Sequence, residues 1–401
     1  MAPQPPQGPV LDSRRFGRTP FAFLLGLSAC SLTATLILVI ILMQRGPAPA
    51  LVGLLLSMLP IPLVLALILL LDRLEPEPRA LLAAIFGAGA GIAAIIIVLG
   101  RLTSSAVIAI PELGPHAGRA VSIGIGAAIG GAVIAESLKG LVLLALLPSR
   151  RTEIDGAHDG VVYASMIGLG FALVANVYAY AVAWNAGAGA IGEEFARRGI
   201  FGPVFQALFT SMIGLGIAYA AARKGATGYW AIALGWVGAV ALATLWDYSV
   251  GFGGAGLGLT YAILIAAVLV LSVVVAADRR RVVVMIHSFL PQYSGTGMVS
   301  HVDVEMLASL RLRRLGRQWA KLNVGSAGVR AMIQYQLAAT ELAMACNRNS
   351  QGRLTPERFA RHRDDSLSLM QAAIDAIRAY EQLYPPPWVG EAPSVFVPPA
   401  S

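Results

Sequence analysis

The chain has 401 residues, of which 57% are hydrophobic and only 13% are charged, and its mean hydropathy is +0.70. These values exclude an ordinary soluble globular protein and indicate a protein that crosses a membrane several times. The formal net charge of +8 gives no reason to expect a nucleic acid partner, because basic loops and a basic tail that face anionic lipid account for it.

The apolar part of the chain predicts an all-α, polytopic helix bundle. Residues 1–20 are rich in Pro and Gly and are expected to be a disordered leader, whereas residues 21–278 are expected to form one transmembrane domain with short loops. The first span is too long for a signal peptide, so we interpret it as retained. The eight predicted spans are 21–43, 49–71, 80–100, 121–147, 159–183, 203–222, 228–250 and 256–277.

The basic residues near the spans predict the orientation. With the N-terminus in the cytoplasm, twelve Arg and Lys residues lie in the inner segments and five lie in the outer segments. We therefore expect a multi-pass protein of the inner (plasma) membrane with both termini in the cytoplasm.

From residue 279 onward the composition is that of a soluble segment. Residues 279–383 are predicted to form a small helical cytoplasmic domain, with helices over 301–321, 327–348 and 355–383. Thr355 is expected to cap the third helix, since Pro356 suits a first helical position. The basic face of the first helix is either solvated or pressed on the inner leaflet.

Residues 384–401 begin with YPPPW and are expected to be disordered, either as a plain tail or as a polyproline ligand. Two cysteines, Cys30 and Cys346, lie in different domains and offer no disulfide framework. The five histidines, at 116, 158, 287, 301 and 362, all fall outside the predicted spans. A zinc site needs three or four converging ligands, so we expect no metal and no other cofactor.

Two charged residues stand near the centre of the fourth predicted span, in the sequence VIAESLKGL. An ionisable side chain there costs roughly 2.5 to 3.5 kcal/mol on insertion scales, so Glu136 and Lys139 require an explanation. Three residues apart, they share one helix face, where an ion pair or a shared proton lowers the cost. They are candidate catalytic residues.

Further polar groups follow in the later spans: Asp159, Asn176, Gln206, Thr210 and Asp247. Such groups either join helices by hydrogen bonds or belong to a site. Trp246 and Tyr248 flank Asp247, which indicates a position toward a membrane interface. Glycines four residues apart, Gly87 with Gly91 and Gly126 with Gly130, are expected to mark close helix packing.

Taken together, these segments resemble the PrsW-type intramembrane proteases of bacteria, over almost the whole chain. Five motifs occur in order: LDRLEPEPRALL is similar to a D-R-x-E-P-E-P signature, AESLKG to E-E-x-x-K, residues 155–180 to D-G-x-x-D-G-x-x-Y with F-x-x-x-E-N, FQALFTSMIGLGIA to H-x-x-F-T-x-x-x-G, and LATLWD to H-x-L-W-N or H-x-x-x-D. The tail around MLASLRLRRLGRQWA resembles the cytoplasmic extension of such proteins.

The chain departs from this pattern at the positions that the resemblance implies to be catalytic. Where the family has two glutamates and two histidines, this chain has Ala135, Ala175, Gln206 and Ala243. Glu136, Lys139, Asn176 and Asp247 remain. Framework positions fit the pattern throughout: Gly168, Gly170, Phe171, Phe209, Thr210, Gly214 and Trp246.

The resemblance implies peptide hydrolysis within the membrane, which needs a general base, an oxyanion donor and an acid. Glu136 remains as a base, with Lys139, Asn176 or Gln206 as donors, but one carboxylate cannot replace a pair with divergent pKa values. We therefore expect a pseudoprotease that binds a transmembrane protein or peptide, in contact with membrane lipid. Two alternatives stay open: an active endopeptidase that uses Glu136 and Asp247, and an ion or small-molecule transporter with Glu136, Lys139 and Asp247 along its path.

Overall fold

A computed structural model describes scattered residues between 31 and 43 and then residues 46–71, 79–108, 117–150, 156–222, 226–249 and 253–383. In this part of the chain every regular element is helical, as predicted. The predicted leader, the tail after residue 383 and most of the first predicted span lie outside the described residues. The described part of the chain divides into two compact units, one that ends at Val275 and one that begins at Ala276.

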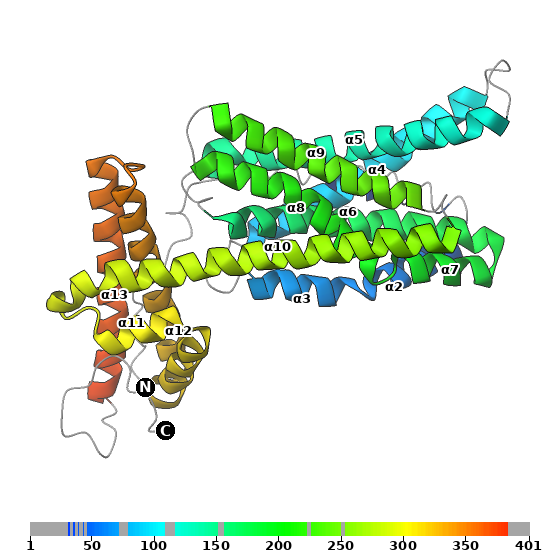
Figure 1. Cartoon of the computed structure of the whole chain (residues 1–401). Helices are drawn as coiled ribbons and strands as arrows, with labels where there is room; N and C mark the ends of the chain where they lie inside the picture. Colours follow the sequence, from blue (N-terminus) through cyan, green and yellow to red (C-terminus); the bar gives the residue numbers. More distant parts are fainter. Residues whose placement is uncertain are drawn as a thin grey trace. The chain divides into compact units, whose positions relative to one another are not determined.

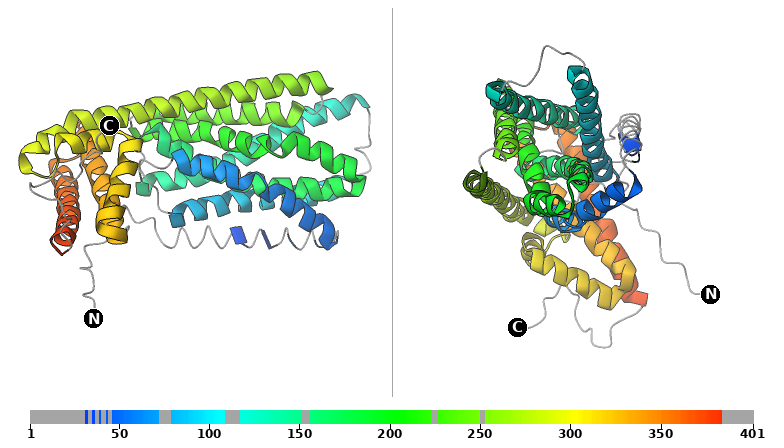
Figure 2. Two further views of the ribbon diagram at one scale, coloured as in Figure 1. Left: turned by 90° about the horizontal axis from the view of Figure 1, so that it is seen from below. Right: turned by 90° about the vertical axis from the view of Figure 1, so that its right-hand side faces the viewer.

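The larger unit is a bundle of long helices (Figures 1 and 2). Its helices are α2 (Pro47–Met58), α3 (Ile61–Leu71), α4 (Arg79–Ile108), α5 (Ala117–Arg150), α6 (Ala157–Ala183), α7 (Ala188–Arg198), α8 (Phe201–Ala222), α9 (Ala226–Tyr248) and the first part of α10 (Gly253–Phe289). The short 3-10 helix η2 (Trp184–Ala186) joins α6 to α7. Helices satisfy their own backbone groups, which the hydrocarbon of a membrane demands.

Seven segments of the described chain are long and apolar enough to cross a membrane. They correspond to the second through eighth predicted spans: Pro47–Leu70, Arg79–Gly100, Ile129–Leu147, Ala157–Ala186, Phe201–Ala221, Thr227–Tyr248 and Gly256–Gly295. The first of these is broken between α2 and α3 at Pro60, which has no N–H group to continue the helix. His158, predicted to lie outside the spans, is instead the second residue of α6 and is buried.

Helix α6 is the centre of the bundle. Over the most apolar 18 residues of its span 89% of the residues are buried, whereas the figure is 17% for the corresponding stretches of α9 and α10. It packs against α8, α4 and α2, and the end-on view in Figure 2 shows helices around it. Asp159 in its first turn accepts a hydrogen bond from the Gly156 N–H over 3.3 Å, so this predicted membrane carboxylate caps the helix.

Glycines allow the backbones of α6 and its neighbours to touch. A Cβ atom on Gly160 would lie 2.2 Å from the Gly214 carbonyl oxygen, and one on Gly170 would lie 1.9 Å from the Phe86 carbonyl oxygen. Of the glycines predicted from their spacing, Gly87 and Gly130 have no atom within 4 Å of a Cβ position, whereas a Cβ atom on Gly91 would lie 2.7 Å from the Ser31 Cα atom. The packing prediction is confirmed for Gly91 and wrong for Gly87 and Gly130, because spacing does not show which face of a helix meets a neighbour.

The smaller unit has its own hydrophobic core. It contains the last part of α10, the 3-10 helix η4 (Leu290–Thr296), α11 (His301–Ala308), α12 (Leu310–Ser350) and α13 (Pro356–Leu383). The core is formed by fully buried side chains that include Met332, Tyr335, Leu342 and Met370.

The helices of this unit partly differ from the prediction. The expected helix over 301–321 is interrupted at Ser309, whose extended backbone and hydroxyl cap the start of α12. The next expected helix joins it in α12, with a kink at Gly325, which adopts φ 73°. The predicted cap of the third helix is confirmed, because the Thr355 hydroxyl accepts the Arg358 N–H over 3.4 Å.

Candidate functional site

Glu136 and Lys139 form an ion pair in the interior of the bundle. The Lys139 Nζ atom donates to the Glu136 Oε1 atom over 2.5 Å. The Glu136 side chain is 1% exposed and the Lys139 side chain is 0% exposed. Because protein surrounds both groups even before lipid is considered, each charge is compensated mainly by the other.

Groups from two further helices complete what we call the buried polar cluster, formed by Glu136, Lys139, Phe171, Gln206 and Thr210. The Lys139 Nζ atom also donates to Gln206 Oε1 on α8 over 3.1 Å. The Thr210 hydroxyl lies 3.5 Å from Glu136 Oε2 and 3.2 Å from the Gln206 carbonyl oxygen. The ring of Phe171 on α6 faces the ammonium group, with its centroid 4.4 Å from Nζ.

The cluster forms here because α6 and α8 approach closely at the same level. A Cβ atom on Gly168 would lie 2.4 Å from the carbonyl oxygen of Gln206, so the two backbones are in contact at that point. Gln206 and Thr210 are one turn apart on α8 and therefore present their side chains on one face. The small residue at 168 thus positions both polar partners of the ion pair.

Asp247 does not join the cluster. It lies in the last turn of α9, is exposed on the isolated bundle and makes no hydrogen bond within the described part of the chain. It interacts electrostatically with Arg198, Lys139 and Arg197, and with Glu136. Asp247 is therefore close enough to interact with both the ion pair and a second group of charges at the end of α7.

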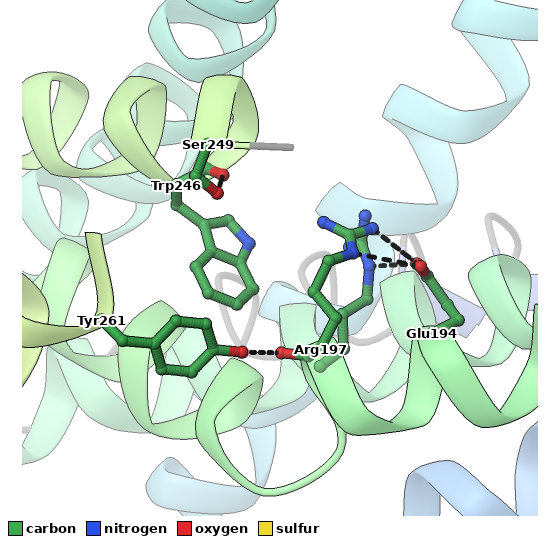
Figure 3. Close-up of polar contacts among 6 residues, drawn as sticks. Glu194, Arg197, Trp246, Ser249 and Tyr261 are labelled. Carbon is green, nitrogen blue, oxygen red and sulfur yellow. Dashed lines mark hydrogen bonds and ion pairs between the residues drawn. The ribbon is translucent and has the colours of Figure 1, made fainter. Parts of the chain in front are cut away.

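The second group of charges is a carboxylate held by two guanidinium groups (Figure 3). Glu194 Oε1 lies 2.7 Å from Arg197 and 2.5 Å from Arg198. Partial burial raises the pKa of Glu194, but Arg198 and Arg197 outweigh this effect and hold that pKa below its usual range. Tyr261 of α10 donates its hydroxyl hydrogen to the Arg197 carbonyl oxygen.

In the sequence the two arginines are interpreted only as loop charges, and Glu194 and Tyr261 are not identified as site residues. The signal was present in GEEFARR, because a glutamate three and four residues before arginines is typical of ion pairs on one helix turn. An aromatic group lies beside it: the Phe205 ring is 5.3 Å from that of Trp246 and 5.6 Å from that of Tyr261. These contacts fasten α10 to α8 and α9.

Asn176 on α6 also lies apart from the cluster. Its side chain is 3% exposed, and its Nδ2 atom has no hydrogen-bond partner in the described part of the chain. A Cβ atom on Gly202 would be 3.8 Å from Nδ2. One turn further, the hydroxyl of Tyr180 is likewise buried and unpartnered among the described residues. These two donors face the region where α7 meets α8.

At two of the four positions where the resemblance leads one to expect reactive side chains, the chain packs buried methyl groups. Ala135 is 8% exposed and Ala243 is 5% exposed. Ala243 belongs to an apolar cluster with Phe209 and Trp246. Within the described residues no second carboxylate contacts Glu136. The structure thus unites Glu136, Lys139 and Gln206 and leaves Asn176 and Asp247 outside.

Comparison with known proteins gives one match. The model of the PrsW family intramembrane metalloproteases matches residues 77–276, the part that holds α4 to α9 and most of the membrane portion of α10. No curated protein and no solved structure matches the chain significantly.

The family description names a metal, and the residues present do not fit one. Within the described part of the chain no three His, Cys, Asp or Glu side chains gather in a way that would hold a metal ion. The cluster offers the oxygens of Glu136, Gln206 and Thr210, and Lys139 already binds two of these groups. Biological zinc sites require three or four nitrogen, sulfur or oxygen ligands.

Proposed function

Because this chain belongs to the PrsW family of intramembrane metalloproteases, we propose that it is a pseudoprotease that binds a transmembrane segment without cleaving it at a useful rate. The observation that carries the proposal is that both carboxylate oxygens of Glu136 already face partners within the protein. One of its oxygens accepts from Lys139 over 2.5 Å and the other faces the Thr210 hydroxyl. A general base needs a free oxygen within hydrogen-bond reach of the attacking water.

The absence of carboxylates at two positions where the family has them supports the same conclusion. Two-carboxylate hydrolysis depends on groups whose pKa values differ, and Ala135 and Ala175 supply no carboxylate next to Glu136. Loss of a member of a catalytic unit commonly lowers the rate by orders of magnitude. The close packing of helices around α6 is retained. A surface that binds a transmembrane helix can therefore persist even where peptide hydrolysis is lost.

We assign the client segment to the exposed face of α5 that lies opposite Glu136. Ile129, Ile134 and Leu141 on this helix are 44%, 51% and 59% exposed. A client helix on this face would be separated from the buried polar cluster by the width of α5. Helices in membranes associate through van der Waals packing with such surfaces.

A crosslinking experiment tests the proposal. A photoreactive amino acid at Ile134 should crosslink a subset of a defined library of single-pass transmembrane peptides in proteoliposomes. The matched control is Leu67 on α3, which has the same exposure of 51%. Equal labelling from both positions, or none from Ile134 above a scrambled library, would contradict client binding at this face.

A second candidate function is an active endopeptidase that uses Glu136 and Asp247. The retention of both carboxylates in the chain is the observation that favours it. The same library supplies the test, because cleavage that is lost in both Glu136→Gln and Asp247→Asn would establish this activity. Product formation that neither substitution changes would remove it.

We also propose that the protein resides in the plasma membrane with both termini in the cytoplasm. The support is the excess of Arg and Lys in alternate loops, which favours the cytoplasmic side. Single cysteines introduced at Gly187 and at Gly352 should differ in labelling by a membrane-impermeant maleimide on intact cells. Only the first, in the loop after α6, is expected to react.

A further inference from the structure

The ammonium group of Lys139 occupies the point where the polar oxygens of the cluster converge. Nζ is 2.5 Å from Glu136 Oε1 and 3.1 Å from Gln206 Oε1. The Thr210 hydroxyl lies 3.5 Å from the other Glu136 oxygen, and the electron-rich face of Phe171 covers a further side of the ammonium. A carboxylate, an amide oxygen and an aromatic face are together a cation site, and the chain's own lysine fills it.

Charge decides whether a metal ion can share this position. Glu136 carries one negative charge and Lys139 one positive charge, so the pair is neutral as it stands. A divalent ion added beside the ammonium would leave an excess of two positive charges in a region that water does not reach, which is strongly unfavourable. Lys139 is 0% exposed, so its ammonium has no contact with solvent in this structure.

We propose that Lys139 is the built-in cation of this site and that the protein binds no divalent metal ion at Glu136. The inference goes beyond the proposed function, because a metal-free protein can be a protease and a metal-bound one can be inert. It departs from the family description, which names metalloproteases. It uses only the contacts of residues on α5, α6 and α8.

Metal content tests the proposal directly. Untagged full-length protein in detergent is incubated with Zn²⁺, Co²⁺ or Mn²⁺, desalted, and measured by elemental analysis beside Glu136→Gln. We expect the two proteins to retain equal amounts of each metal, since any ion on surface histidines is common to both. One additional ion per chain in the wild type would overturn the proposal.

A measurement on the unmodified protein covers the case in which Glu136→Gln does not fold. An ion bound only to the native state raises the unfolding temperature, and a chelator then lowers it. We expect the same unfolding temperature with EDTA, without it and with added Zn²⁺. A fall in EDTA that Zn²⁺ reverses would overturn the proposal. Neither result depends on peptide cleavage or crosslinking, so failure here is distinct from failure of the proposed function.

Discussion

Lys139 donates to Glu136 over 2.5 Å inside the bundle, and neither side chain is more than 1% exposed. Two opposite charges that share one helix turn satisfy each other at a depth where each alone would be costly. The pair explains why a membrane span tolerates both residues. It also explains why Glu136 is poorly placed to accept a proton from water.

The first prediction concerns the stability of this pair. Removal of one partner of a buried ion pair costs roughly 3 to 5 kcal/mol, whereas removal of both is often close to neutral. Glu136→Gln and Lys139→Met should each lower the unfolding temperature in detergent, and the double variant should lie nearer to the wild type. Additive losses in the double variant would show that the two charges do not stabilise each other.

The second prediction concerns the contact between α6 and α8. A Cβ atom on Gly214 would lie 2.1 Å from the Gly160 carbonyl oxygen, so Gly214→Ala must push two backbones apart. We expect a loss of about 1 to 3 kcal/mol in the free energy of unfolding. Gly87→Ala is the matched control, because no atom lies within 4 Å of its Cβ position. Similar unfolding temperatures for the two variants would contradict the close approach.

The sequence predicts the spans well because apolar length is a property of each segment alone. Residues 203–222, for example, correspond to the observed Phe201–Ala221. The contact between Lys139 and Gln206 joins residues 67 positions apart, and nothing in the local pattern specifies it. Gly87 and Gly214 illustrate the same limit, since both are glycines in apolar helices and only one meets a neighbouring backbone.

Some helix ends can be predicted from the sequence and others cannot. Thr355 with Pro356 carries a local capping signal and was identified correctly. Ser309 carries the same kind of signal, but it lies within a helical pattern that continues on both sides, so the break between α11 and α12 was missed. Asp247 and Asn176 were grouped with Glu136 from polarity alone, and their places depend on how α9 and α6 are rotated in the bundle.

The third prediction concerns pH and Glu194. Arg198 and Arg197 hold the pKa of Glu194 below its usual range, so the ionised form favours the folded state. This stabilisation is fully present above the unfolded pKa of about 4.3 and is lost as the pH falls through the lower folded value. Glu194→Gln should therefore cost about 1 kcal/mol at neutral pH.

Thermal unfolding of both proteins across the acidic range checks this sign. The difference in unfolding temperature between the wild type and Glu194→Gln should shrink toward zero only below the unfolded pKa. A difference that stays constant down to the most acidic pH, or grows there, would show that Glu194 does not act through its charge. High salt should reduce the neutral-pH difference, because the group is partly exposed.

The last prediction separates function from stability at Asn176. A buried donor without a partner costs roughly 1 to 3 kcal/mol, so Asn176→Leu, which removes it at similar volume, should leave the unfolding temperature equal or raise it. If a client segment supplies an acceptor to this amide, the same substitution should weaken crosslinking from Ile134. Tyr180→Phe is the companion variant, since it removes the neighbouring unpartnered hydroxyl. A lower unfolding temperature with unchanged crosslinking would mean that Asn176 serves only to pack α6 against α8.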